Sequence, residues 1–362
     1  MPRAFLLSRH LAFWALVCSV VCFVACKDEP LPPPPTQDIC PALLALNEGM
    51  LKCEVSADEY QPRNDSTQWG AYVCSINEDI NQYKPINPSI STMARVEAFE
   101  HIAALLWKKP TPSSADFEKA KERYALNEGL DSRVQRREDV HFEALPGAQK
   151  CSEAGLAEQC PGRCAGPAHI LPVLNDAFAK GMQGQDTSIQ ARRIEAALLW
   201  FFYLSSLAEV QSCAETPNNC DSAWAYYTGG TPRDEPVGLA AYVRALSPET
   251  HERAYDAALA VRCWRDLDQA VPANNTTLQS LALGQYDKAL IRGIALILNE
   301  RASKWADPAQ HAFVQTLFAL METQATQRNA ALAQELKTWV DNPATNSISR
   351  IHEIVGFLFP CP

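Results

Sequence analysis

One short segment of the chain alternates residue types that bind metals. Asp139, His141 and Glu143 are separated from one another by single residues. In an extended backbone, side chains two residues apart point to the same face, so these three would converge. Two carboxylates and an imidazole are ligands that suit iron and other transition metals. The segment therefore predicts a metal site. The alternative is a solvated connection, and a helical backbone would disperse the three side chains.

A second metal-binding pattern lies on an expected helix. Glu97, Glu100 and His101 stand at positions i, i+3 and i+4, so they share one helical face. Ferritin-like iron sites take Glu-x-x-His pairs from two helices. The one such pair in this chain runs from Glu138 to His141, outside the trio, so the ferritin pattern is incomplete. The trio predicts iron ligation, and a polar flank beside an apolar stripe is the alternative.

Other patterns that carry chemistry are missing from the sequence. It holds no Gly-x-Ser-x-Gly motif, no phosphate loop, no His-Glu-x-x-His and no dinucleotide fingerprint. Glu195 and Glu209 would lie roughly 21 Å apart along one helix, too far to share a metal, so each is expected to pair with arginines. These observations predict that the protein is not an enzyme.

Helices must position these residues, because glycine is scarce and strand-like alternation is rare. Residues 189–210 include an apolar run from Leu198 to Leu204, and a helix that is apolar on all sides is buried. Ser247-Pro248-Glu249 and Asp307-Pro308 are typical helix starts, and Asn342-Pro343 is a typical helix end. The sequence predicts an all-α fold of many helices.

Two glycines mark a further helix end. Asp221 is expected to cap a helix over 222–228, which Gly229 and Gly230 would stop. We expect one compact helical domain over 40–362, and a division of that domain into two lobes is the alternative. Its length is sufficient for a large core.

The first residues form an export leader. Arg3 and Arg9 provide positive charge, and residues 11–24 are apolar without a charge. This stretch is shorter than the roughly 20 residues that a membrane span needs, but it suits the core of a signal peptide. Ala25 before Cys26 fits cleavage between them. We expect a signal peptide over 1–25 and a lipid-modified Cys26, and the alternative is an ordinary leader cut near Ala25 that leaves a soluble periplasmic protein.

A lipidated Cys26 would anchor the chain to a bilayer without a transmembrane helix, since two or more acyl chains such as palmitate hold a protein stably. Residues 26–39 contain Pro30 and the run Pro32 to Pro35. Clustered prolines favour an extended spacer, so this segment is expected to be a tether. The prediction is a lipoprotein of the bacterial cell envelope, on the outer membrane and facing the periplasm or the surface.

The cysteines point to the same compartment. Of the 13 cysteines, Cys18 and Cys22 leave with the leader and Cys26 takes lipid, so an even ten remain. An even count in an exported chain favours disulfides. Cys213 and Cys220 flank a short polar loop and are the candidate pair that the sequence singles out.

Cys151, Cys160 and Cys164 form a cluster for which a metal is the alternative to disulfides. Their spacing matches no common zinc pattern. Thiolates also oxidise in an exported protein, which favours disulfides.

The chain is acidic, with a net charge of −10. Nucleic-acid binding proteins present basic faces, so the charge argues against a nucleic-acid partner. It is compatible with cation binding, although acidity commonly serves solubility.

Three stretches are similar to one family. They run from Asp221 to Gly230, from Ala260 to Asp268 and from Gly129 to Phe142. They resemble the low-iron-inducible, iron-assimilating periplasmic proteins of algae and their bacterial lipoprotein relatives, which tend to carry an acidic residue where Ser222 stands. The resemblance implies a non-enzymatic helical protein of iron acquisition, with iron as ligand and iron-uptake proteins as partners. It assigns no ligand residues.

Overall fold

The computed structural model describes residues 75–361, except 77–78, 88–89, 127–128, 148, 214, 217, 267–275 and 343–347. The predicted signal peptide (1–25), the lipid site Cys26 and the tether (26–39) lie outside the described residues. Within them, no helix is long and apolar enough to cross a membrane.

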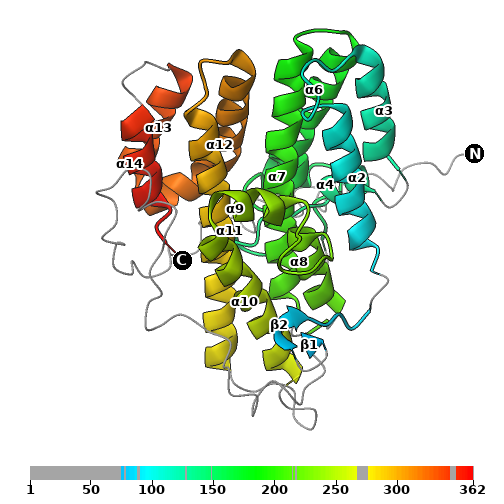
Figure 1. Cartoon of the computed structure of the whole chain (residues 1–362), viewed down its shortest axis with the longest axis vertical. Helices are drawn as coiled ribbons and strands as arrows, with labels where there is room; N and C mark the ends of the chain where they lie inside the picture. The colour runs from blue at the N-terminus through cyan, green and yellow to red at the C-terminus, as the bar shows by residue number, and fades with distance from the viewer. Residues whose placement is uncertain are drawn as a thin grey trace, which may run out of the picture.

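Helices make up most of the described structure, with one small antiparallel hairpin at its start (Figure 1). In chain order the elements are β1 (Ser75–Ile76), β2 (Asp79–Tyr83), α2 (Thr92–Leu105), α3 (Ser114–Tyr124), α4 (Leu130–Val134), α5 (Leu156–Gln159), the π-helix η2 (Gly166–Ile170), α6 (Leu171–Met182), α7 (Thr187–Gln211), α8 (Asn218–Thr228), α9 (Leu239–Leu246), α10 (Pro248–Asp266), α11 (Thr276–Ala302), α12 (Pro308–Arg328), α13 (Ala330–Asp341) and α14 (Ile348–Leu358). The predicted all-α fold with disulfides is confirmed.

Helix α7 is the central helix, as the apolar run in its sequence predicts. It packs against α6, α8, α11 and α12 (Figure 1). Every side chain from Leu198 to Leu204 is at most 2 % exposed. Phe202 meets Phe99 of α2 edge to face, with ring centroids 5.0 Å apart. Because α7 is apolar on all sides, it stabilises the fold only where neighbouring helices surround it.

The predicted helix starts at Ser247 and Asp307 are confirmed. The Ser247 hydroxyl accepts a hydrogen bond of 3.2 Å from a backbone N–H in the first turn of α10. The Asp307 carboxylate accepts one of 2.9 Å at the start of α12. Asn329 caps α13 in the same way at 3.0 Å. Each cap satisfies an N–H that has no partner within its own helix.

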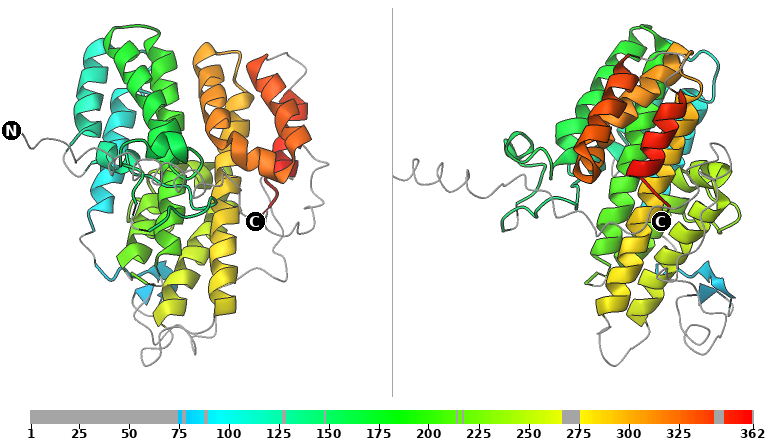
Figure 2. Two further views of the ribbon diagram at one scale, coloured as in Figure 1. Left: turned by 180° about the vertical axis from the view of Figure 1, so that it is seen from behind. Right: turned by 90° about the vertical axis from the view of Figure 1, so that its left-hand side faces the viewer.

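The prediction that Asp221 caps a helix is wrong. Helix α8 begins at Asn218, so Asp221 lies inside the helix, where it is fully buried. Its carboxylate accepts hydrogen bonds from the Tyr83 hydroxyl at 2.9 Å and from the Asn87 backbone N–H at 2.7 Å. Asp221 therefore holds the segment that includes β2 against α8, beside α10 (Figure 2).

Candidate metal-binding site

His141 lies on a loop between α4 and α5 rather than on a regular element. Val140 and His141 form a turn, which the Phe142 N–H closes by donating to the Asp139 carbonyl at 3.3 Å. The Asp139 carboxylate accepts from the His141 backbone N–H at 3.0 Å and lies 2.7 Å from ring atom Nδ1. Asp139 therefore fixes both the turn and the direction of the imidazole ring.

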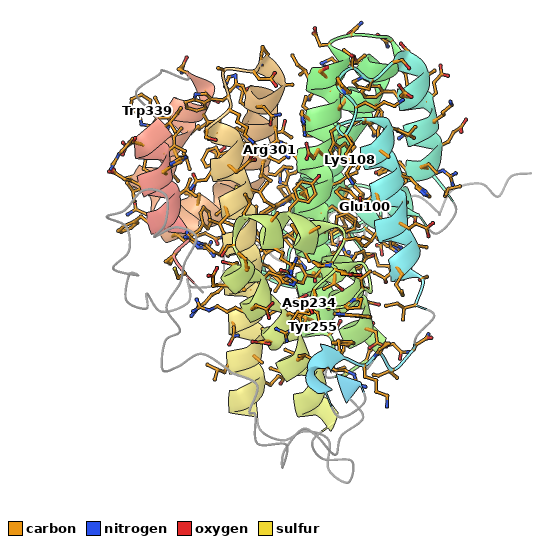
Figure 3. All side chains as sticks on the ribbon, in the orientation of Figure 1. Glu100, Lys108, Asp234, Tyr255, Arg301 and Trp339 are labelled. Carbon is orange, nitrogen blue, oxygen red and sulfur yellow. A yellow bond between two sulfur atoms is a disulfide. The ribbon has the colours of Figure 1, made fainter. Side chains whose placement is uncertain are left out.

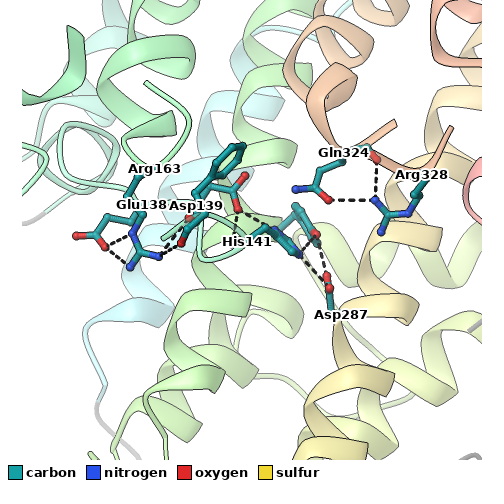
Figure 4. A network of polar contacts seen from close by, with 9 residues as sticks. Glu138, Asp139, His141, Arg163, Asp287, Gln324 and Arg328 are labelled. Atoms are coloured by element: carbon teal, nitrogen blue, oxygen red, sulfur yellow. Dashed lines mark hydrogen bonds and ion pairs between the residues drawn. The ribbon is translucent and has the colours of Figure 1, made fainter. Parts of the chain in front are cut away.

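Two helices bring further polar groups to the other side of the ring. Asp287 of α11 places Oδ2 at 3.0 Å from His141 Nε2. Tyr203 of α7 donates its hydroxyl proton to Asp287 Oδ1 at 2.8 Å, and the same hydroxyl lies 3.5 Å from His141 Nε2. Figure 4 shows His141 between Asp139 and Asp287. An imidazole, a carboxylate and a phenol from three separate elements thus converge on one point.

Electrostatics make His141 a cation at neutral pH. Burial alone would lower the pKa of the imidazole, but Asp287 and Asp139 together raise it to about 10. Burial would also raise the pKa of Asp287, but the charge of His141 and hydrogen bonds from His141 and Tyr203 lower it. Burial, followed by the charge of Asp287, raises the pKa of the Tyr203 phenol well above its ordinary value.

Arg328, the last residue of α12, supplies a second positive charge. Its Nη1 donates to the Gln324 backbone carbonyl at 2.9 Å and to the Gln324 side-chain oxygen at 3.0 Å. Its guanidinium lies 5.1 Å from the centre of the Phe359 ring. From this position its charge lowers the pKa of Asp287. The two acidic side chains that contact His141 are thus balanced by His141 and Arg328 (Figure 4).

Of the first predicted trio, the structure brings Asp139 and His141 together but leaves Glu143 out. Glu143 is exposed. The expected extended backbone is wrong, because the turn at His141 sends Glu143 away from the other two. Val140 and Phe142 also pack toward the interior of the protein, which favours the turn.

The second predicted trio is not gathered into a site. Glu97 and His101 are exposed on α2. Glu100 instead accepts from Lys108 at 2.7 Å and from the Gly238 backbone N–H at 3.0 Å (Figure 3). Its carboxylate links α2 to the start of α9, in line with the polar-flank alternative.

Two cysteine predictions have clear outcomes. Cys213 and Cys220 form the predicted disulfide. Cys151 pairs with Cys164, and Cys160 is also disulfide-bonded, which excludes the metal alternative for that cluster.

Glu195, a carboxylate that the sequence singles out, is hydrogen-bonded by protein side chains alone. Glu195 is fully buried and accepts from Arg192, from the Tyr242 hydroxyl at 2.9 Å and from Arg301 at 3.0 Å. Glu209 lies 3.6 Å from Arg137. Both carboxylates pair with arginines, as expected.

The polar atoms around His141 lie at hydrogen-bond distances, which are also the distances between neighbouring ligands of one metal ion. Oxygen and nitrogen ligands about 2.1 Å from a metal in octahedral geometry lie about 3 Å from one another. The distances among His141 Nε2, Asp287 and the Tyr203 hydroxyl run from 2.8 to 3.5 Å. Among the described residues no group of three His, Cys, Asp or Glu side chains could hold a metal. A metal at His141 would therefore need the Tyr203 phenol as a third donor.

Sequence reasoning missed Tyr203 and Asp287. Tyr203 stands within the apolar run of α7, where a tyrosine is expected to be core. Asp287 is 146 residues from His141 along the chain, so no spacing relates them. The local sequence gives no signal either, because Asp287 is followed by Lys288 and preceded by Gln285 and Tyr286, as on an ordinary polar helix face.

Comparison of the chain with family models, with curated proteins and with solved structures gives no match.

Proposed function

We propose that this protein is an exported bacterial lipoprotein, anchored to the outer membrane through Cys26, that binds iron as cargo and does no chemistry on it. His141, Asp287 and Tyr203 are its proposed ligands. Asp139 is their outer partner, because it fixes the ring nitrogen that faces away from the metal. In many metal sites a carboxylate orients a ligating histidine in this way.

One observation carries the proposal: two oxygen donors and one nitrogen donor from α7, α11 and the 135–143 loop converge within 3.5 Å of one another. The side chains of His141 and Asp287 are 18 % and 23 % exposed, so solvent reaches the group. Carboxylate, phenolate and imidazole together suit iron among the transition metals. The resemblance to iron-assimilating proteins favours the same metal.

We expect the mature protein to bind Fe(III), supplied as its nitrilotriacetate complex, at one site. Phenolate ligation by Tyr203 should give a visible charge-transfer absorption band. Tyr203→Phe should remove that band. Asp287→Asn should weaken binding on the order of 100-fold or more, since loss of an outer partner alone costs about 10–100-fold. Titration followed by absorbance and by elemental analysis measures both effects.

The matched controls come from the other predicted trio. Glu97→Gln and His101→Gln alter exposed side chains of the same types and should leave the affinity and the band unchanged. If the wild-type protein binds no iron above background, or if the α2 variants lose binding and the Asp287 variant does not, the proposed site is wrong.

Lipidation is tested separately. In a bacterial host grown with labelled palmitate, we expect label on the membrane-bound wild-type protein and none on Cys26→Ala. Cys22→Ala, which changes a cysteine within the leader, should keep the label. An unlabelled wild-type protein in the soluble periplasmic fraction would favour an ordinary signal peptide.

A second candidate function is a structural or partner-binding lipoprotein without metal. The observation in its favour is that both ring nitrogens of His141 already have carboxylate partners. In that case the network serves to fix the 135–143 loop to α7 and α11. If the wild-type protein binds no iron and His141→Gln lowers the stability of the protein, this candidate would be supported.

A further inference from the structure

One arginine contacts the loop that carries His141 at three residues. Arg163 donates from Nε to the Glu138 carboxylate at 2.8 Å. Its Nη1 donates to the backbone carbonyls of Asp139 at 3.3 Å and of Phe142 at 2.9 Å. The guanidinium therefore contacts the chain on both sides of the turn, at Asp139 before it and at Phe142 after it (Figure 4).

The backbone around Arg163 reinforces this contact. The Asp139 N–H donates to the Arg163 carbonyl at 2.7 Å, and the Gly166 N–H donates to the Arg137 carbonyl at 2.9 Å. A Cβ at Gly166 would lie 2.1 Å from the Val134 carbonyl oxygen, so the close approach requires glycine. The segment 163–166 thus runs directly against the loop.

A disulfide fixes this segment in turn. Cys164, next to Arg163 and fully buried, is bonded to Cys151. Asp287 and Tyr203 lie on long packed helices, whereas His141 has no regular element to hold it. The position of the imidazole relative to its partners therefore depends on the contacts of the loop.

We propose that Arg163 is the positioning residue of the site. It holds the 138–142 turn in the one conformation that places His141 Nε2 against Asp287 and Tyr203. Arginine suits this task because its planar fork reaches a carboxylate and two carbonyls at once, which a lysine ammonium on a flexible stem does not. The effect on iron affinity rests on the proposed function, but the placement of the imidazole ring does not.

Iron titration of Arg163→Met and Arg163→Lys tests the expected effect of Arg163 on iron affinity. Both variants should bind iron about 10–100-fold more weakly than wild type, as removal of an outer partner typically does. The lysine variant keeps the charge, so its failure to restore affinity identifies the fork geometry as the cause. Arg350→Met is the matched control, because Arg350 forms an exposed ion pair with Glu335 and should be neutral. Wild-type affinity in both Arg163 variants would overturn the proposal.

Nitrogen-15 NMR of the His141 imidazole in the metal-free protein tests whether Arg163 places the ring. In wild type, each ring nitrogen of His141 lies within hydrogen-bond distance of a carboxylate, so a proton on either nitrogen should exchange slowly with water. Both Arg163 variants should lose at least the slow Nε2 proton, while near-ultraviolet circular dichroism confirms that they remain folded. If Arg163→Met does not fold, the lysine variant decides. If the wild-type protein binds no iron but the Arg163 variants lose the slow Nε2 proton, the proposed function is wrong and the positioning role is supported. If ring-proton exchange is unchanged in a folded Arg163 variant, the positioning role is wrong.

Discussion

Replacing His141 by glutamine is expected to destabilise the protein by about 3–5 kcal/mol at neutral pH. Removal of one partner from a buried ion pair leaves an uncompensated charge and costs about 3–5 kcal/mol. The side chains of His141 and Asp287 are 18 % and 23 % exposed, which places the loss toward the lower end of this range. Here the change leaves two carboxylates, Asp139 and Asp287, without the cation between them. Urea denaturation measures the effect as a lower midpoint at an unchanged slope.

The loss of folding stability in His141→Gln is expected to decrease as the pH rises. The pKa of His141 is raised to about 10 in the folded protein and is about 6.5 in an unfolded chain. A raised pKa gives stability that is fully present below about pH 6.5 and is lost as the pH rises toward 10. The stability difference between wild type and His141→Gln should therefore be largest near pH 6 and should shrink toward pH 10.

Two variants isolate the cause. His101→Gln changes an exposed histidine of α2 and should cost little. His141→Gln combined with Asp287→Asn should recover part of the loss, because it also removes one of the stranded charges. A pH-independent loss would mean that packing of the ring, and not its charge, stabilises the loop.

The helices could be predicted because their signals are local. Serine or aspartate followed by proline marks the starts of α10 and α12, and an unbroken apolar run marks α7 as buried. Asp221 shows where local reasoning fails. It has the residue type of a cap, but its partners are Tyr83 and Asn87, which lie 138 and 134 residues away. The same side chain can satisfy a helix end or a distant segment, and only tertiary packing decides between them.

Only the part of the candidate site whose residues are close in sequence could be predicted. Asp139 and His141 are close in sequence, so their types and spacing indicated a metal site. The same spacing predicts Glu143 as a third ligand only if the backbone is extended, because side chains two residues apart share a face in a strand. Local contacts of Asp139 close the turn instead. Arg163 adds further contacts from more than 20 residues later, and no spacing relates that arginine to the turn.

Iron affinity is expected to rise steeply with pH. The metal must displace the Nε2 proton of His141, whose pKa is about 10, and the phenolic proton of Tyr203, whose pKa is raised well above its ordinary value. Metal ligands must be deprotonated, so binding below pH 10 releases both protons. By linkage, two released protons raise the affinity for the free ion about 100-fold per pH unit.

Competition against a chelator of known pH dependence gives the affinity, and a pH-stat counts the protons released. Tyr203→Phe and His141→Gln each remove one of the two protons, so each should reduce the dependence to about tenfold per pH unit. His101→Gln should keep the wild-type slope. An iron affinity that does not vary with pH, or that varies equally in all four proteins, would place the bound iron away from His141 and Tyr203.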